Sequence, residues 1–264
     1  MKSWANRVAV ATIAGCAASC STMSQSGENW QSLFDGKTLD GWTPKIRGLP
    51  LGENHQNTFR VRDGAIVVSY DGYDKFNERF GHLFYKTPFK AYRLRLEYRF
   101  LNDHPADTPG WAIANSGVMI FSQDPKTMAV GDSFPVSVEA QLLGPAPGQT
   151  RTNGNMCSPG TNVVMDGQLV TQHCINSKTP AGPNEVWTRF EIEVTPQGQV
   201  TQKINDVPTI VYSGVQLDPT GNMANSKPLI EAAGGKLALD GGWISLQSEG
   251  NPIEFRKIEI MELK

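Results

Sequence analysis

The sequence lacks a strong net charge. Its 264 residues include 24 Lys and Arg against 26 Asp and Glu, which leaves a formal charge of −2. Nucleic-acid-binding domains gather basic residues on one surface, and charged tails contain long runs of one sign. The near balance of charges therefore excludes a basic field that would attract nucleic acid, and we expect no nucleic-acid partner.

The sequence also lacks a sustained helical pattern and an internal repeat. No stretch places apolar residues at a period of about 3.6, and the absence of a fixed repeat disfavours a propeller. Short alternating runs bounded by Gly, Pro, Asn and Asp are present instead. These runs are AIVVSY, HLFYKT, YRLRLEYRF, GVMIFS, VSVEAQLL, TRFEIEV, QVTQKIN, WISLQS and IEFRKIEIMEL. They predict an all-β fold, namely a two-sheet antiparallel sandwich or jelly roll.

No apolar run is long enough to span a bilayer, but the N-terminus has the form of an export signal. Two basic residues precede the stretch VAVATIAG, which matches a signal-peptide core. The stretch ends in IAGC, which resembles the bacterial lipobox and makes Cys16 the expected lipidation site. Cys20 is a second candidate, and a plain secretory peptide cleaved near Ala18 is the alternative.

We therefore expect residues 1–20 to form a lipoprotein signal peptide and residues 21–29 to form a polar tether. Both readings of the leader predict an exported protein, periplasmic or anchored at the outer membrane. The predicted contact with a membrane is through the lipid anchor alone. Residues 30–264 contain no evident linker and are predicted to form one domain.

Two cysteines remain after the leader, Cys157 and Cys174. In an oxidising compartment they are expected to form a disulfide, which would stabilise the fold by about 3 kcal/mol. A metal site that includes the neighbouring His173 is the alternative, although no CxxC spacing supports zinc. Cys157 also lies in the longest irregular stretch, 145–160, and loops of that length are commonly binding elements or are cross-linked.

Two predicted strands carry unusual polar faces. In SVEAQLLG, Glu139 and Gln141 point to the same side, because strand side chains alternate. In YRLRLEYRF, Glu97 and Arg99 share one side. If both polar sides line one sheet face, the four side chains converge in a groove suited to sugar hydroxyls. The alternative is a solvated face held by weak Glu–Arg pairs across strands.

Several segments together resemble the 3-keto-disaccharide hydrolase domain family. They are LFDGKTLDGWTP, RLRLEYRF, NSGVMIFS, VEAQLLG, WTRFEIEV with INDV, and ISLQSEGNPIEFRKIEI. The resemblance covers almost all of residues 30–264 in the family's order. It implies an exported bacterial protein with a concanavalin A-like lectin/glucanase jelly roll.

The resemblance also implies a reaction. A sugar oxidised to a ketone at C3 has an acidified hydrogen at C2, so a base can remove it and the bond at C1 breaks by elimination. Water then adds, for net hydrolysis of a 3-keto-disaccharide or 3-keto-glucoside. Such an enzyme needs a base, donors or a metal ion for the enolate oxygen, and an acid for the leaving group. The Glu-x-Asp-x-x-Glu pattern of laminarinase-like glucanases is absent.

Residue by residue, the resemblance implies a groove with Glu139 as base or metal ligand. Arg256 would bind a carboxylate or the carbonyl oxygen, although its neighbours Ile258 and Ile260 look like core residues. Either a bulge intervenes or Arg256 lies at the rim. The residues that the resemblance places in or beside the groove are Asn115, Ser116, Glu139, Gln141, Arg256, Glu97 and Gln247.

Three further residues are candidates. His173 lies in the Cys-flanked loop, where it is either a catalytic acid or base or a surface histidine. Glu249 stands in LQSEG where the family often has His, and would serve as an alternative acid. Trp111 would stack on a sugar ring or pack in the core. A divalent metal ion held by Glu139 and His173 is possible, but the spacing is not diagnostic.

Two functions follow from these residues. The first is an enzyme that cleaves 3-keto-glycosides through Glu139, assisted by His173 or Glu249. The alternative is a non-catalytic carbohydrate-binding domain tethered at the cell envelope, because jelly rolls serve both roles. Buried charges are costly unless they are used, and this argument favours the enzyme.

Overall fold

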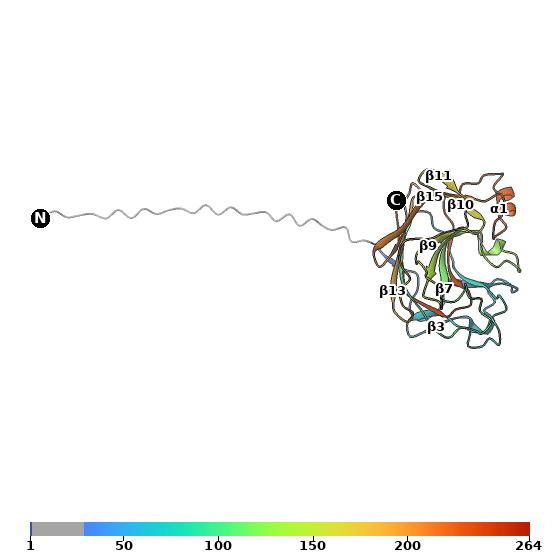
Figure 1. The fold of residues 1–264 in the computed structure, drawn as a ribbon. Helices are drawn as coiled ribbons and strands as arrows, with labels where there is room; N and C mark the ends of the chain where they lie inside the picture. Colours follow the sequence, from blue (N-terminus) through green and yellow to red (C-terminus); the bar gives the residue numbers. More distant parts are fainter. Residues whose placement is uncertain (2–28) are drawn as a thin grey trace.

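The computed structural model describes residue 1 and residues 29–264, which form two antiparallel β-sheets packed face to face (Figure 1). The predicted signal peptide, nearly all of the tether and Cys16 lie outside the described residues, so those predictions stay predictions. Within the described residues, no helix is both long and apolar enough to cross a membrane.

The larger sheet has ten strands in the order β11-β10-β15-β14-β13-β6-β17-β4-β3, with β1 paired to β17. Their bounds are β1 Gln31–Ser32, β3 Phe59–Arg62, β4 Ala65–Val68, β6 Tyr92–Phe100, β10 Thr161–Met165, β11 Gln168–Val170, β13 Thr188–Val194, β14 Val200–Ile204, β15 Val207–Leu217 and β17 Ile253–Glu262.

The smaller sheet has seven strands in the order β12-β9-β8-β7-β16-β5-β2. Their bounds are β2 Trp42–Ile46, β5 Gly81–Tyr85, β7 Asn115–Ser122, β8 Val138–Leu143, β9 Asn155–Cys157, β12 Cys174–Ile175 and β16 Trp243–Ser248. The helical elements are short: η1 His55–Asn57, η2 Pro125–Thr127 and α1 Lys227–Ala232.

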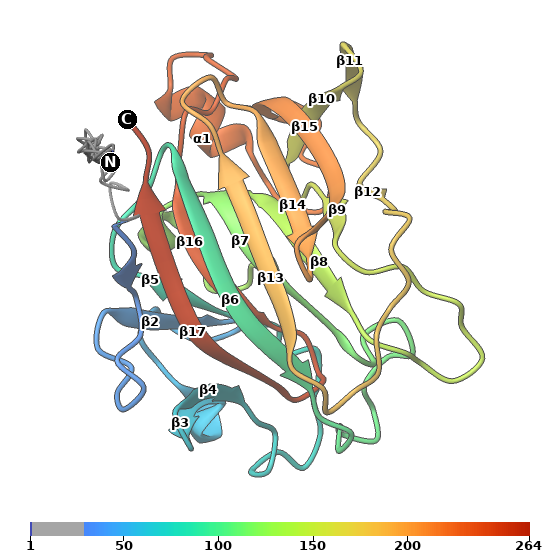
Figure 2. The same cartoon turned by 90° about the vertical axis from the view of Figure 1, so that its left-hand side faces the viewer.

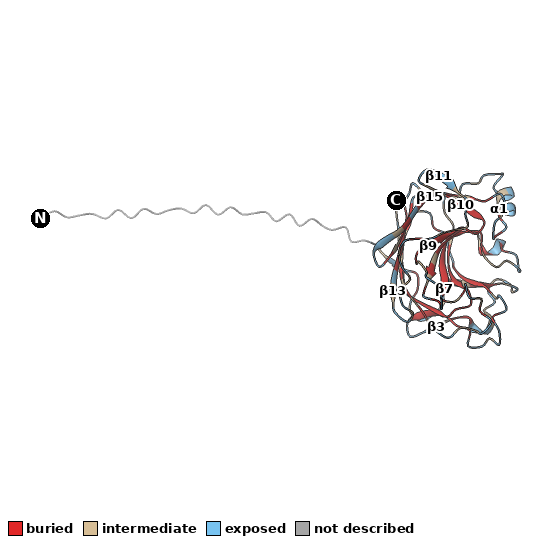
Figure 3. Ribbon diagram, in the orientation of Figure 1, coloured by how far each residue is buried: buried red, intermediate tan, exposed pale blue. Residues whose placement is uncertain are grey.

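Alternation of side chains explains the core between the sheets. On β6, Leu94, Leu96 and Tyr98 are buried, while the residues between them are partly exposed. On β8, Val138 and Ala140 face the same core from the other sheet. Buried residues concentrate along the strands of both sheets (Figure 3). The predicted all-β, two-sheet antiparallel sandwich is confirmed.

The polar face of β6 does not share a groove with Glu139 and Gln141, because β6 and β8 belong to different sheets, and this corrects the prediction for Glu97 and Arg256. Both residues lie on the side of the larger sheet that faces away from the core, where β17, β6 and β13 run side by side (Figure 2). Arg256 Nε donates to Glu97 Oε2 at 2.7 Å, and Lys257 Nζ donates to Glu97 Oε1 at 2.9 Å. The alternative, a solvated face of ion pairs, describes this surface.

A local irregularity explains why Arg256 faces solvent although Ile258 and Ile260, which strict alternation would place on the same side of β17, are buried. The register between β17 and β6 shifts between Arg256 and Glu259, and Lys257 has a φ of 51°. One extra residue in a strand changes which side chains face the core. This bulge lets Phe255 and Ile258 both be buried while Arg256 faces solvent.

Candidate functional site

The site lies on the face of the smaller sheet that is turned away from the larger sheet, which we call the site face. On β8, Glu139 and Gln141 belong to this face, because Val138, Ala140 and Leu142 fill the core. The neighbouring strand β7 contributes residues of the same parity, since Gly117 pairs with Gln141 and Met119 pairs with Glu139.

Loops that cross the site face enclose a groove with two adjoining lobes. The carboxyl lobe is a cavity of about 340 Å³ that contains Glu139 and Glu249. The amide lobe is a cavity of about 320 Å³, and its lining includes no acidic residue. The residues common to both lobes are Trp111, Asn115 and Gln141. The rest of the carboxyl lobe is lined by Glu78, Phe80, Phe134, Cys157, Pro159, His173, Cys174 and Met223.

Glu139 and Glu249 form a buried carboxyl pair. They are 5% and 4% exposed, and one oxygen of each is buried without a partner. Burial raises the pKa of Glu139 to about 8. Burial, and then the charge of Glu139, raises the pKa of Glu249 well above its ordinary value. The pair therefore loses its first proton near pH 8 and afterwards holds one acid and one base.

Gln141 presents amide donors to the groove. Asn155 Oδ1 accepts from the Ser177 backbone N–H at 2.9 Å, so its Nδ2 must be the atom that faces Gln141. That Nδ2 donates to Gln141 Oε1 at 2.9 Å. Because the carbonyl oxygen of Gln141 is engaged, its NH₂ group faces away from Asn155 and is free to bind a ligand oxygen.

Trp111 stands at the boundary of the two lobes with 51% of its surface exposed. Its ring stacks on Phe80, with centroids 5.9 Å apart and planes at 27°. Arg151 holds the surrounding loop, because its guanidinium donates to the carbonyl oxygens of Gly110, Trp111 and Ile113. An exposed aromatic face held in this way is a surface on which a sugar ring can stack.

A disulfide joins Cys157 and Cys174, with an S–S distance of 2.04 Å, and confirms the predicted bond. The metal alternative for these cysteines is wrong. Their ligand atoms and that of His173 lie within 4.8 Å of one another, but both sulfurs are bonded in the disulfide. Burial lowers the pKa of His173, so it is neutral at pH 7 and is placed on the cavity wall as predicted.

A divalent ion held by Glu139 and His173 stays a prediction. Both line the carboxyl lobe, and Glu139 Oε1 and His173 Nδ1 are buried without partners. These two atoms, an oxygen and an imidazole nitrogen, are ligands that several divalent metals accept. A bound ion would supply positive charge for an enolate oxygen.

Two predicted residues lie near the groove but do not line it. Ser116 faces the core, where its hydroxyl donates to the Gln247 carbonyl at 2.9 Å, so its predicted place in the groove is wrong. Gln247 belongs to the site face but is fully buried behind the cavity wall. The predicted residues that the structure brings together are Glu139, Glu249, His173, Asn115, Gln141 and Trp111.

The aromatic wall and the amide lobe were not predicted from the sequence. Phe80 and Phe134 pack with ring centroids 5.1 Å apart, and no pattern in the sequence distinguishes them from core residues. Arg151 and Asn155 belong to the irregular stretch 145–160, whose length was the one available signal.

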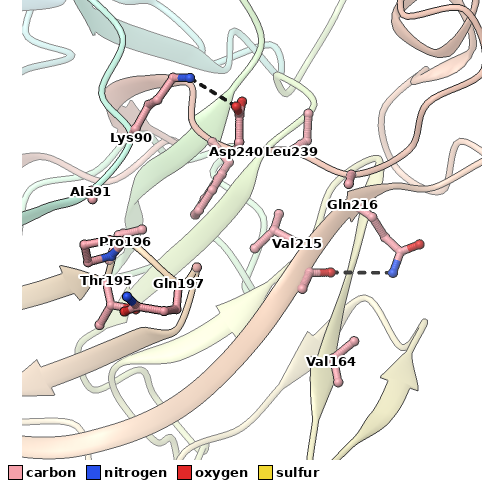
Figure 4. Close-up of a pocket in the computed structure, with 15 residues that line it drawn as sticks. Lys90, Ala91, Val164, Thr195, Pro196, Gln197, Val215, Gln216, Leu239 and Asp240 are labelled. Carbon is pink, nitrogen blue, oxygen red and sulfur yellow. Dashed lines mark hydrogen bonds and ion pairs between the residues drawn. The ribbon is translucent and has the colours of Figure 1, made fainter. Parts of the chain in front are cut away.

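A cavity larger than either lobe lies elsewhere, at one end of the sandwich, and measures about 640 Å³ (Figure 4). Its wall is mostly apolar, with Val215, Leu239 and Pro196 among the side chains that face it. Lys90 and Asp240 at its rim form an ion pair of 3.1 Å in which both side chains are exposed. This cavity therefore contains no buried acid–base pair like that of the carboxyl lobe.

Residues 29–261 match the family described as the 3-keto-alpha-glucoside-1,2-lyase-like domain. The chain belongs to this family. No curated protein sequence matches it. The family match covers the carboxyl pair, the amide donors and the disulfide, and it agrees with the resemblance found in the sequence.

Solved structures confirm the fold. Two proteins from Parabacteroides distasonis ATCC 8503 that carry the name "putative glycosyl hydrolase" superpose with TM-scores of 0.53 and 0.51, at 17% and 18% identity. The first match covers 90% of this chain and 95% of the other, and the second covers 89% and 100%. The lumenal domain of VIP36 in its Ca²⁺/Man3GlcNAc-bound form superposes with a TM-score of 0.50 at 10% identity, covering 90% and 91%. The predicted concanavalin A-like lectin/glucanase fold is confirmed.

Proposed function

We propose that this protein is an enzyme that cleaves the glycosidic bond of 3-keto-glucosides by elimination, followed by addition of water. The observation that carries the proposal is the buried carboxyl pair, Glu139 and Glu249, in a groove lined by amides and aromatic rings. Membership of the 3-keto-alpha-glucoside-1,2-lyase-like family supports the substrate class.

In this proposal Glu139 is the base and Glu249 the acid. Ionised Glu139 removes the proton at C2, and the electron pair of that C–H bond forms the enolate of the C3 ketone. The enolate then expels the leaving group from C1, and protonated Glu249 supplies the proton that the leaving oxygen needs. The oxygen of a water molecule then bonds to C1 while one proton of that water passes to the Glu249 carboxylate. The proton held by Glu139 returns to C2, which gives the free 3-keto sugar and restores both carboxyl groups.

The amide groups around the pair would stabilise the enolate. Gln141 offers its NH₂ group because Asn155 engages its carbonyl oxygen. Asn115 Nδ2 donates to the Trp111 carbonyl at 3.3 Å and has a second N–H to offer, while its Oδ1 is buried without a partner. Fixed donors at the position where negative charge develops lower the barrier of such steps.

The two lobes fit the two sides of the scissile bond. The keto sugar would occupy the carboxyl lobe, where the base lies, and the leaving group would occupy the amide lobe. Trp111, which borders both lobes, would stack on one of the rings. His173 on the cavity wall, neutral at pH 7, would accept or donate a hydrogen bond with the keto sugar.

The alternative is a carbohydrate-binding domain without turnover. The similarity to a VIP36 domain solved with Man3GlcNAc favours this reading at the level of fold alone. A binding groove gains nothing from two buried carboxyl groups that repel each other when ionised, since their burial costs stability. This cost favours the enzyme.

Mass spectrometry of products tests the proposal directly. The purified protein would be given a 3-keto-glucoside and, in parallel, the same glucoside without oxidation. We expect cleavage of the keto sugar alone, and its loss in Glu139→Gln, which keeps the shape of the side chain. Binding of either sugar without any cleavage would establish the carbohydrate-binding alternative.

A further inference from the structure

The carboxyl group of Glu139 is buried but is not held by a hydrogen bond. Its Oε1 has no partner, and no residue in the described part of the chain donates to it. A general base displaced by about 1 Å loses roughly a hundredfold in rate. Some other feature of the site must therefore hold the carboxyl group in place.

Gly117 provides the space in which that carboxyl group lies. A Cβ atom added to Gly117 would be 2.6 Å from both Cγ and Oε1 of Glu139, a separation that real Cβ contacts essentially never show. Gly117 is not among the residues with positive φ, so the backbone there does not require glycine. Glycine is needed here because the side chain of Glu139 lies against Gly117, in the space that a Cβ atom would occupy.

A row of buried polar side chains lies on the other side of Gly117. Leu246 pairs with Val118, which places Gln247 of β16 opposite Gly117. Gln247 in turn pairs with His82 of β5, and His82 pairs with Lys45 of β2. These three side chains are at most 2% exposed.

The polar atoms of this row lack partners. Gln247 Nε2, Gln247 Oε1 and His82 Nε2 are buried without hydrogen bonds, as is Glu139 Oε1 beside them. Lys45 Nζ reaches only the carbonyl oxygens of Ile46 and Val130, at 3.4 and 3.3 Å. Buried polar groups are nearly always paired, and internal water supplies partners where several polar atoms surround one space.

We propose that Gly117 and Gln247 are positioning residues for the carboxyl group of Glu139. Gly117 leaves the space that the carboxyl group occupies, and Gln247, backed by His82, holds it through buried water. The catalytic meaning rests on the proposed function, whereas the position of the carboxyl group does not depend on it.

The substitution Gly117→Ala tests whether the space beside Gly117 holds the carboxyl group of Glu139 in place. We expect kcat on a 3-keto-glucoside to fall about a hundredfold while KM stays within about twofold, because the base moves and the rest of the groove does not. Gly81→Ala is the matched control, since Gly81 lies in a strand with an ordinary φ and a Cβ there would meet Ile46 and Phe59. A folded Gly117→Ala variant with the kcat of the control overturns the role of Gly117.

The substitution Gln247→Leu tests whether water fills the space between the buried polar side chains and Glu139. If water fills the row, removing the amide lowers kcat about tenfold, shifts the pH profile of kcat and does not raise Tm. If the row is empty, Leu replaces two unpaired polar atoms, so Tm rises and kcat is unchanged. The second result overturns the role of Gln247.

High-resolution crystal structures separate this inference from the proposed function. If the wild-type protein cleaves no 3-keto-glucoside, the proposed function fails, yet the position of the carboxyl group can still be seen. We expect ordered water between Gln247 and Glu139, and a displaced Glu139 side chain in Gly117→Ala. If no water lies between Gln247 and Glu139, or if the carboxyl group of Glu139 does not move in Gly117→Ala, the inference is overturned whatever the activity.

Discussion

Asn155 Nδ2 donates to Gln141 Oε1 at 2.9 Å, and this contact decides which end of the Gln141 amide faces the groove. Asn155 cannot reverse its own amide, because its Oδ1 accepts from the Ser177 backbone N–H and from Thr152 Oγ1. The orientation of the Gln141 amide is thus set by Asn155, and the orientation of Asn155 is set in turn by its hydrogen bond from the Ser177 backbone N–H.

We predict that Asn155→Asp reverses the Gln141 amide. The substitution keeps the acceptor for Ser177 but replaces the donor with a carboxylate oxygen, which repels Gln141 Oε1 and attracts its NH₂ group. The groove then loses a donor, and we expect kcat/KM on a 3-keto-glucoside to fall about tenfold or more. Gln141→Leu should cost a similar amount, and the double variant should cost no more than either change alone. Additive losses would contradict the coupling.

The raised pKa of Glu139 predicts how stability depends on pH. The folded value, about 8, lies above the ordinary value of 4.5, so the folded protein binds the proton more tightly than the unfolded chain does. This contribution is fully present below pH 4.5 and is lost as the pH rises through 8. The free energy of unfolding should therefore fall by up to about 1.4 kcal/mol per pH unit across this window. Glu139→Gln should weaken this dependence in urea unfolding at several pH values, and the part that remains comes from Glu249, whose pKa burial also raises.

The same pair predicts the pH dependence of the reaction. Glu139 acts as a base only after the pair has lost its first proton, near pH 8. We expect kcat/KM to rise with pH up to about 8, because this parameter reports the ionisation of the free enzyme. Glu249→Gln removes the acid, so kcat should fall most for glucosides with poor leaving groups. Equal losses for good and poor leaving groups would argue against Glu249 as the acid.

Strand positions in the fold could be read from the sequence because alternation is a local signal. The run YRLRLEYRF is β6 from its first residue to its last, with every second residue buried. Strands interrupted by Pro or Gly were missed, such as β2 with Pro44 and β15 with Pro208 and Gly214. Such residues weaken the local pattern, and the pairing of neighbouring strands compensates for them only in the folded state.

The site was predictable in part for the same reason. Alternation shows that Glu139 and Gln141 share a face, but it does not reveal which sheet a strand joins. Glu97 was therefore placed in the groove, although β6 belongs to the other sheet. Glu249 was found because it departs from the family pattern, whereas the space above Gly117 depends on a contact between two strands.

The ion pairs on the larger sheet give a prediction that tests the corrected placement. Arg256→Ala removes the bond to Glu97 and a stacking contact with Trp187, whose ring lies 3.9 Å from the guanidinium. Because the pair is partly exposed, we expect a loss of about 1 kcal/mol in unfolding free energy. Activity on a 3-keto-glucoside should stay within about twofold of wild type. A large loss of activity at unchanged stability would show that Arg256 acts in the site after all.

The disulfide should matter for both stability and the groove. Cys157 pairs with Glu139 across β8 and β9, and Cys174 follows His173, so the bond lies in the wall beside the base. Replacing both cysteines with Ala should lower the free energy of unfolding by about 3 kcal/mol. The freed loop should also raise KM, because His173 loses its fixed place. Thermal unfolding and steady-state kinetics of the double variant, compared with the reduced wild-type protein, measure the two effects.

Arg151 gives the last prediction, because it makes Trp111 a rigid surface. Three carbonyl oxygens of the Trp111 loop accept from its guanidinium, and a lysine has no fork of donors to replace these bonds. Arg151→Lys should therefore loosen Trp111 and weaken sugar binding about tenfold, with little change in kcat. Titration of Trp fluorescence in a Glu139→Gln background measures binding without turnover. Trp111→Ala in the same background shows how much sugar binding is lost when the ring is absent. If Arg151→Lys binds sugar as tightly as the background protein, Trp111 is held by its stacking on Phe80 and not by the guanidinium.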